Sequence, residues 1–175
     1  DCLAFTIKEL GDFTSTIKTL QPGQKVFLDG PYGAFSIDRH SHSPQFAFLA
    51  GGVGITPVMS MLRTLADRGD RRPLLLIYAN KDWESVIFRE EIDELKSVLD
   101  LEVVHVLQNA PPEWNGETGF VSQSLLDRYL PKQKMRNTIE IFICGPQPMM
   151  DAVEAALLRI GVSIGDFHSE RFNLV

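Results

Sequence analysis

The stretch LAGGVGITP, Leu49 to Pro57, decides the fold. It follows an apolar run at 46–49 and carries three glycines and a Thr-Pro pair, and a helical pattern runs from Pro57 to Asp67. Glycines at a strand-to-helix turn let the backbone approach a ligand closely, and the start of a helix attracts anions. The stretch therefore predicts a phosphate-binding turn with Thr56 as helix N-cap and Pro57 as first helical residue. A tight turn that only packs closely is the alternative.

Apolar and helical segments alternate along the rest of the chain. The pattern predicts further strands at 74–78, 101–107 and 139–143, helices at 85–99, 123–129 and 148–160, and an extended piece at 167–172. Strands such as LLLIY and IEIFI are nearly uninterrupted apolar runs, which is typical of a parallel sheet with helices on both faces. The regular order of strand and helix predicts an α/β fold with a doubly wound parallel sheet.

The opening of the chain has a different pattern. Residues 3–8 (LAFTIK) and 24–28 (QKVFL) are rich in strand formers, and GDFTSTIKTL between them predicts a short helix. A polar loop follows at 36–45. We therefore place a boundary in that loop and expect two parts, 1–43 and 44–175.

Composition bounds the possible functions. The chain has 175 residues, of which 44% are hydrophobic and 23% charged, as in an ordinary globular protein. Its net charge of −6 argues against a nucleic-acid or anionic-membrane partner, because both reward a basic surface. The two cysteines, Cys2 and Cys144, lie in no metal-ligand spacing and suit free thiols in the cytoplasm. The longest uncharged stretch, 41–62, is interrupted by prolines and glycines, so we expect no membrane span in it.

A second turn with a similar setting is Cys144-Gly145-Pro146, which also follows a strand and opens a helix. In an open α/β sheet, ligands bind beyond the carboxyl ends of the strands where the strand order reverses. Two such turns from neighbouring strands can hold the two ends of one dinucleotide. The alternative for Cys144 is a small buried hydrophobe.

The segment after the second sheet strand contains Asn80, Lys81 and Asp82. The ribose of a dinucleotide belongs here, where an acidic residue binds a 2′-hydroxyl and a basic one accepts a 2′-phosphate. Both an acidic and a basic residue are present. We favour NADP as the cofactor, and NAD remains the alternative. The alternative is that Asp82 caps the following helix while Lys81 is solvated.

Histidines and hydrolytic motifs give weaker signals. His40 and His42 form an H-x-H pair, but no third ligand is evident nearby, so we predict no metal site. His105 and His168 have no visible partner. No G-x-S-x-G elbow or paired-carboxylate motif is present, which argues against a hydrolase.

Three ordered motifs resemble the ferredoxin–NADP reductase superfamily: AGGVGITP, CGP at 144–146 and SERF at 169–172. Upstream, LAFTIK, GDFT at 11–14 and LDGPYG at 28–33 resemble the last part of that family's flavin-binding barrel. GDFTSTIKTL, DGPYGAFS and ERFNLV look most like the cytosolic reductase part of ferric-reductase or NADPH-oxidase-like membrane flavocytochromes. The resemblance implies that 1–43 is the C-terminal part of a truncated FAD-binding barrel and 44–175 an NAD(P)-binding domain.

The resemblance also implies roles for matching residues. Thr56 would lie near the nicotinamide, Cys144 on the other side of the reacting ring, and Phe172 over the flavin with the carboxylate of Glu170 beside it; these four are the expected catalytic residues. Gly11 to Thr14 would contact the FAD pyrophosphate, and Lys81 a 2′-phosphate. The full set expected to bind NADP (or NAD) and FAD is Gly11, Asp12, Phe13, Thr14, Gly51, Gly52, Val53, Gly54, Ile55, Thr56, Pro57, Asn80, Lys81, Cys144, Gly145, Pro146 and Phe172.

One departure from the family matters for activity. The family's main flavin motif, Arg-x-aromatic-Ser/Thr or an HPF-type version, has no match in this chain. We therefore expect a piece of a longer flavoenzyme that alone binds FAD poorly and is nearly inactive.

The resemblance implies that hydride passes from NAD(P)H to FAD and electrons pass onward to an acceptor. That acceptor would be a haem-containing membrane domain, a ferric chelate or a redox protein, and the chain would be cytoplasmic or the cytosolic domain of a membrane protein. Two alternatives remain: a soluble reductase component that feeds an iron–sulfur or oxygenase partner, and a non-catalytic nicotinamide-nucleotide-binding regulatory module.

Overall fold

The computed structural model describes residues 3–30, 32–131 and 138–171. It divides into two compact units, Asp1–Ala34 and Phe35–Val175, and each is described by itself. All six sheet strands belong to the second unit. Over the described ranges, none of the helices combines the length and apolar character that crossing a membrane requires.

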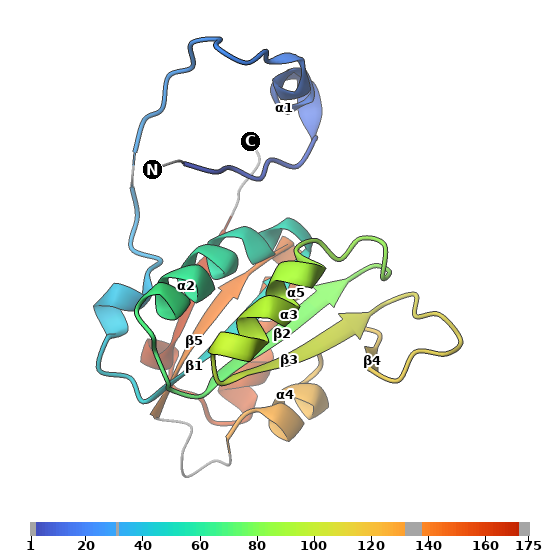
Figure 1. Cartoon of the computed structure of the whole chain (residues 1–175). Coiled ribbons are helices and arrows are strands. Elements are labelled where there is room, and N and C mark those ends of the chain that lie inside the picture. The colour runs from blue at the N-terminus through green and yellow to red at the C-terminus, as the bar shows by residue number, and fades with distance from the viewer. Residues whose placement is uncertain (1–2, 31, 132–137, 172–175) are drawn as a thin grey trace. The chain divides into compact units, whose positions relative to one another are not determined.

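A six-stranded parallel sheet forms the centre of the second unit (Figure 1). The strands lie in the order β4-β3-β2-β1-β5-β6 and span β1 Gln45–Gly51, β2 Leu74–Asn80, β3 Leu101–Leu107, β4 Glu117–Thr118, β5 Ile139–Cys144 and β6 Phe167–Glu170. The chain builds outward from β1 to β4 and then returns to place β5 on the other side of β1. The strand order therefore reverses between β1 and β5, which confirms the predicted doubly wound sheet.

Helices cover both faces of the sheet (Figure 1). They are α2 Ile55–Asp67, α3 Arg89–Val98, α4 Gln123–Tyr129 and α5 Gln147–Arg159, with short 3₁₀ turns η2 Ile37–His40, η3 Gly52–Gly54 and η5 Ile164–Asp166. Phe46 and Phe48 of β1 pack with α2 and α3, while Ala47 and Leu49 pack with α4 and α5. Alternate side chains of one strand thus enter two separate cores, which is why the strands read as continuous apolar runs.

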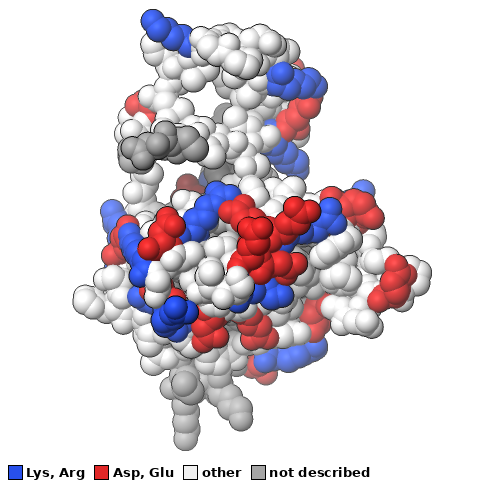
Figure 2. Space-filling model, in the orientation of Figure 1, with Lys and Arg blue, Asp and Glu red and all other residues white. Residues whose placement is uncertain are grey.

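Charged side chains of both signs lie interspersed on the face that carries α2 and α3 (Figure 2). Arg63 of α2 makes a two-pronged ion pair with Glu91 of α3, with one Nη2–Oε2 distance of 2.8 Å. A paired guanidinium and carboxylate of this geometry fixes the orientation of two neighbouring helices.

The first unit contains the short helix that the sequence predicts, as α1 Gly11–Thr16 followed by η1 Ile17–Thr19. The strands expected at 3–8 and 24–28 are not strands in the structure. Strand residues need a neighbour for their backbone hydrogen bonds, and the described part of this unit supplies none. Their apolar side chains are accordingly exposed, Phe27 to 97%.

Two predicted helix starts were wrong. Helix α2 begins at Ile55, so Gly54 is its N-cap rather than Thr56, and Pro57 is its third residue. The reason is that η3 winds directly into α2. Helix α3 begins at Arg89 rather than at 85, after Phe88 adopts a left-handed φ of 59°.

Candidate functional site

The two glycine turns meet where the strand order reverses. A Cβ atom added to Gly54 would lie 2.2 Å from the carbonyl oxygen of Cys144, closer than real Cβ contacts allow. A Cβ on Gly145 would lie 3.0 Å from the backbone nitrogen of Gly51. The turns therefore pack backbone against backbone, at the place where the sequence predicts that they converge.

Gly52 lies at the open side of this contact. Its φ is +52°, a conformation that favours glycine, and a Cβ there would meet nothing within 4 Å. The hydroxyl of Tyr78 donates a hydrogen bond to the Gly52 carbonyl at 3.2 Å. Among the described residues, no side chain caps the start of η3 or α2. The backbone amides of a first helical turn lack intrahelical partners, so this turn suits an anion.

Tyr78 is a site residue that was not predicted from the sequence. The signal was present, because a tyrosine in the otherwise aliphatic strand LLLIYAN must find a hydrogen-bond partner when it is buried. Tyr78 is fully buried, and burial raises the pKa of its phenol. It therefore remains a neutral donor that holds the Gly52 carbonyl in place.

Asn80 ends β2 on the same side of the sheet as Tyr78. It is only 5% exposed, and neither its amide nitrogen nor its amide oxygen has a hydrogen-bond partner in the described structure. Leaving such a buried polar group unsatisfied costs about 1–3 kcal/mol. The orphaned amide therefore suits a polar ligand bound at the carboxyl end of β2.

Lys81 and Asp82 follow directly and differ in their surroundings. Lys81 is exposed. Asp82 accepts hydrogen bonds from the hydroxyl and the backbone N–H of Ser85, the latter at 2.9 Å, and the Ser85 hydroxyl holds the pKa of Asp82 below its usual range. The sequence left open that Asp82 caps the following helix. Asp82 instead caps the turn at Ser85, because helix α3 begins only at Arg89.

Cys144 and Glu170 lie opposite each other on β5 and β6. Cys144 is completely buried, and burial, together with the nearby charge of Glu170, raises the pKa of its thiol to about 12. The thiol therefore stays protonated near neutral pH and cannot act as a thiolate nucleophile. Glu170 is half-buried.

Strand β6 is fastened to α5 by polar contacts. Arg171 makes ion pairs with Asp151 at 2.8 Å and with Glu154 at 2.6 Å, and the Ser169 hydroxyl donates to Glu154 at 2.6 Å. These contacts hold Glu170 beside Cys144. Phe172, the aromatic that the resemblance implies next to them, lies outside the described residues.

The other expected residues lie directly after the glycine turn or in the first unit. Thr56 and Pro57 are half-buried in the first turn of α2, and Pro57 also lines a pocket of about 290 Å³ between α2 and residues 35–38. Gly11 to Thr14 are the first four residues of α1 in the first unit, where the Thr14 hydroxyl hydrogen-bonds to the backbone of Leu10. Their expected role stays a prediction.

Comparison with known proteins places the chain in a family. Residues 48–155 match the family described as the oxidoreductase NAD-binding domain. The chain belongs to this family. The matched range includes the two turns and Asn80. It therefore contains the place between β1 and β5 where the strand order reverses.

Individual relatives of this NAD-binding domain are reductases by name. The chain is 32% identical over 161 residues to NADH-cytochrome b5 reductase 1 of Cryptococcus neoformans, which covers 87% of this chain and 54% of that protein. It is 34% identical over 171 residues to a nitrate reductase [NADPH] of Fusarium oxysporum, which covers 90% of this chain and 19% of that protein. The chain thus spans about half the length, or less, of these relatives.

Solved structures confirm the fold. The CS-b5R domains of human Ncb5or, in the NAD⁺ form, have a TM-score of 0.80 at 30% identity over 94% of this chain and 47% of that one. Ferredoxin-NADP⁺ reductase from Plasmodium falciparum has a TM-score of 0.74 at 21% identity over 91% of this chain and 65% of that one. Together with the match to the oxidoreductase NAD-binding domain and the reductase relatives, this fold confirms the predicted resemblance to the ferredoxin–NADP reductase superfamily.

Proposed function

We propose that this chain is the dinucleotide-binding module of an NAD(P)H-dependent flavin reductase. The observation that carries the proposal is the backbone contact between the Gly51–Gly54 turn and Cys144–Gly145. The contact brings the glycines of both turns together at the carboxyl ends of β1 and β5, with Met149 packed beside Gly51 and Gly145. A dinucleotide binds at such a reversal in strand order. Membership of the NAD-binding family supports the same reading.

The residues at this place fit a dinucleotide. The amides of residues 52–54 and the positive end of α2 would hold the pyrophosphate. The orphaned amide of Asn80 would bond to a ribose hydroxyl or to the adjoining phosphate. When bound, the nicotinamide supplies a hydride, FAD accepts it, and FAD returns the electrons one at a time.

Side chains near the reacting ring would position it and exclude water. The Thr56 hydroxyl, in the first turn of α2, would hydrogen-bond to the nicotinamide amide. Cys144, which is completely buried and stays protonated, would keep the protein wall behind the ring uncharged. Glu170 and Phe172 would contact the flavin, and Gly11 to Thr14 would bind its pyrophosphate; these roles rest on the family resemblance.

The choice between NADPH and NADH depends on the end of β2. Relatives carry both names, NADPH in the nitrate reductase and NADH in the cytochrome b5 reductase. Asp82 is engaged by Ser85, which leaves the exposed Lys81 as the charge that can meet a 2′-phosphate. We propose that the site accepts NADPH.

The names of the relatives also support a haem-type acceptor. We propose that the intact protein passes electrons to such an acceptor in the cytoplasm. A haem protein, a ferric chelate and an iron–sulfur partner are the acceptors that the assay below distinguishes.

The test uses the intact protein that contains this chain. NADPH or NADH is added without oxygen, the loss of oxidised-flavin absorbance is followed in a single turnover, and cytochrome b5, ferric citrate or a ferredoxin is then offered as acceptor. We expect the flavin to bleach. Nucleotide binding that leaves the flavin oxidised contradicts the proposal and supports a non-catalytic regulatory module.

A matched pair of variants tests the assignment of Thr56. Thr56→Val should slow hydride transfer by about 10- to 100-fold while dinucleotide affinity changes little, because the lost hydroxyl positions the ring. Thr64→Val makes the same change two turns later in α2 and should leave the rate unchanged. Weakened binding with an unchanged transfer rate in Thr56→Val means that the role is wrong.

A further inference from the structure

Three side chains that are far apart in the sequence come together at the β5–β6 edge of the sheet. His40 lies in η2, Glu140 in β5 and His168 in β6. His168 Nε2 lies 2.6 Å and His40 Nδ1 3.3 Å from the same Glu140 oxygen, and the three atoms all lie within 4.8 Å of one another. Of the two histidines in the H-x-H pair, only His40 belongs to this cluster, and the side chain of His42 is exposed.

The donor set is of a kind that binds transition metals. Two imidazoles and one carboxylate are the three protein ligands of many open zinc sites, which keep a fourth position for water. With metal–ligand bonds near 2.0–2.1 Å, ligand atoms of a tetrahedral site lie about 3.3 Å apart. The His40–Glu140 distance already has this value. The His168–Glu140 hydrogen bond would have to lengthen by about 0.7 Å, which a side-chain rotation supplies.

An aromatic wall orients both imidazoles. The ring of Phe142, in β5, lies 5.8 Å from the ring of His40 and 5.2 Å from that of His168. The two histidine rings lie 4.0 Å apart. Phe142 is fully buried, whereas the side chains of the three candidate ligands are 21–24% exposed. An ion can therefore enter from solvent while the ligands are packed from behind.

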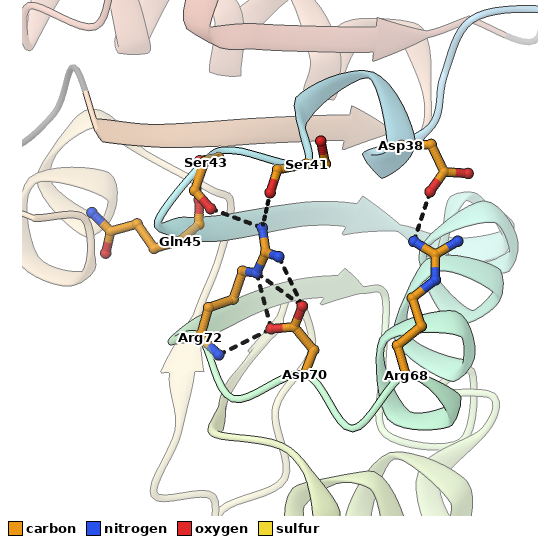
Figure 3. A network of polar contacts seen from close by, with 7 residues as sticks. All are labelled: Asp38, Ser41, Ser43, Gln45, Arg68, Asp70 and Arg72. Atoms are coloured by element: carbon orange, nitrogen blue, oxygen red, sulfur yellow. Dashed lines mark hydrogen bonds and ion pairs between the residues drawn. The ribbon is translucent and has the colours of Figure 1, made fainter.

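Arg72 anchors the backbone segment of Ser41 and Ser43, which follows η2 (Figure 3). Arg72 donates hydrogen bonds to the backbone carbonyls of Ser41 at 3.3 Å and Ser43 at 2.8 Å, and it pairs with Asp70 at 2.8 Å. The guanidinium thus fixes the backbone directly after His40. Ligands held in this way lose little freedom when a metal binds.

We propose that His40, Glu140 and His168 form a binding site for a divalent transition-metal ion, with Zn²⁺ the best match. The site lies at the start of β5, four residues before Cys144 and therefore about 13 Å along the strand. A bound ion would fasten η2 and the edge strand β6 to β5. The proposal does not depend on the proposed function.

The alternative to a metal site is a cluster that is held together by hydrogen bonds and ion pairs alone. Without metal, the Glu140 carboxylate accepts hydrogen bonds from one or both imidazoles, and such a cluster only joins the three elements. Metal binding replaces these hydrogen bonds by bonds to the ion and is weakened by acid, because protons compete for the imidazole nitrogens.

The experiment titrates the metal-free 175-residue chain with Zn²⁺ against a chromophoric chelator and, separately, with Co²⁺. We expect one equivalent of Zn²⁺ per chain and visible Co²⁺ bands of a four- or five-coordinate site. Glu140→Gln and His168→Gln should each weaken Zn²⁺ binding by about tenfold or more, since even residues that only support metal ligands have effects of this size. The control His42→Gln should bind like the unchanged chain.

Nuclear magnetic resonance of the unchanged chain gives a test that needs no variant. Zn²⁺ should shift the imidazole signals of His40 and His168 and leave those of His42 and His105 in place. The proposal is overturned if Zn²⁺ binding does not saturate, if His42→Gln loses as much affinity as the ligand variants, or if the shifts occur elsewhere. In those cases the three side chains only connect η2, β5 and β6 through hydrogen bonds and ion pairs.

Discussion

Asn80 illustrates how a single buried residue is arranged for a ligand at the expense of stability. We predict that Asn80→Leu, a change of similar size, leaves the melting temperature of the ligand-free chain equal or higher, because it removes an unsatisfied buried amide. Dinucleotide affinity should fall by about tenfold or more, since the lost hydrogen bonds are worth about 1–3 kcal/mol.

Differential scanning fluorimetry and calorimetric titration with NADPH measure these two effects. The control is Asn109→Leu, an exposed asparagine just after the neighbouring strand β3. An Asn80→Leu chain that loses stability without losing affinity shows that the amide serves the fold alone.

Cys144 makes the stability of the chain depend on alkaline pH. The pKa of its thiol is raised from 9.0 in the unfolded chain to about 12 in the folded chain. The buried, protonated thiol therefore contributes its full stability to the fold below pH 9, and this stability is lost as the pH rises toward 12. Between pH 9 and 10 we predict that the free energy of unfolding falls by up to about 1.4 kcal/mol per pH unit on account of this thiol. The prediction is limited to pH values up to 10, because the pKa of the buried Tyr78 phenol is also raised and its ionisation in the unfolded chain lowers stability at higher pH.

Urea unfolding at pH 8 to 10 tests this prediction. Cys144→Ala should flatten the pH dependence in this window, whereas Cys2→Ser should retain it. Equal slopes in the unchanged chain and Cys144→Ala would mean that the thiol ionises as readily in the fold as in the unfolded chain.

At the scale of elements, the sequence was most informative where a pattern is local. The apolar runs predict β2, β3 and β5 closely, and the bounds of β3 and α4 agree with the structure. Helix starts were less predictable, because a cap depends on how the preceding turn winds, as at Gly54 before α2.

Features that depend on distant partners were not predictable. The segments 3–8 and 24–28 have strand-like composition, but a strand requires a neighbour that no local pattern reveals. The convergence of the two glycine turns was predictable, because parallel strands end at one edge of the sheet. The meeting of His40 with Glu140 and His168 was not, because it depends on where η2 and β6 lie against β5.

Gly54 connects η3 and α2 to the end of β5, and we predict that Gly54→Ala destabilises the chain by about 1–3 kcal/mol. The new methyl group would lie 2.2 Å from a backbone oxygen and 2.5 Å from a backbone carbon of Cys144, which cannot move like a flexible side chain. Dinucleotide affinity should fall as well, because the two turns must separate.

Chemical denaturation and NADPH titration of Gly54→Ala measure both effects. Gly165→Ala is the control, because a Cβ there meets nothing within 4 Å and should change stability by less than about 1 kcal/mol. If both variants behave alike, the close contact between the turns does not constrain the site.

At the scale of the whole molecule, the division into two units leads to a prediction about folding. The buried members of both hydrophobic cores begin at Ile37, and the described residues between 3 and 34 contribute none. Those residues instead expose large apolar side chains, with Phe13 at 78% and Phe27 at 97%. We therefore predict that a chain of residues 35–175 unfolds in one cooperative transition, with a melting temperature within about 4 °C of the full 175 residues. It should keep its affinity for the dinucleotide.

The matched comparison is a chain of residues 41–175, which also lacks the buried Ile37 and His40. It should melt several degrees lower, because removing a buried isoleucine costs about 2–5 kcal/mol, and it should lose the Zn²⁺ response. Calorimetry and the two titrations separate these effects. If residues 35–175 alone fail to fold, the first 34 residues belong to the same cooperative unit as the sheet, and the dinucleotide site is then not a property of the second unit by itself.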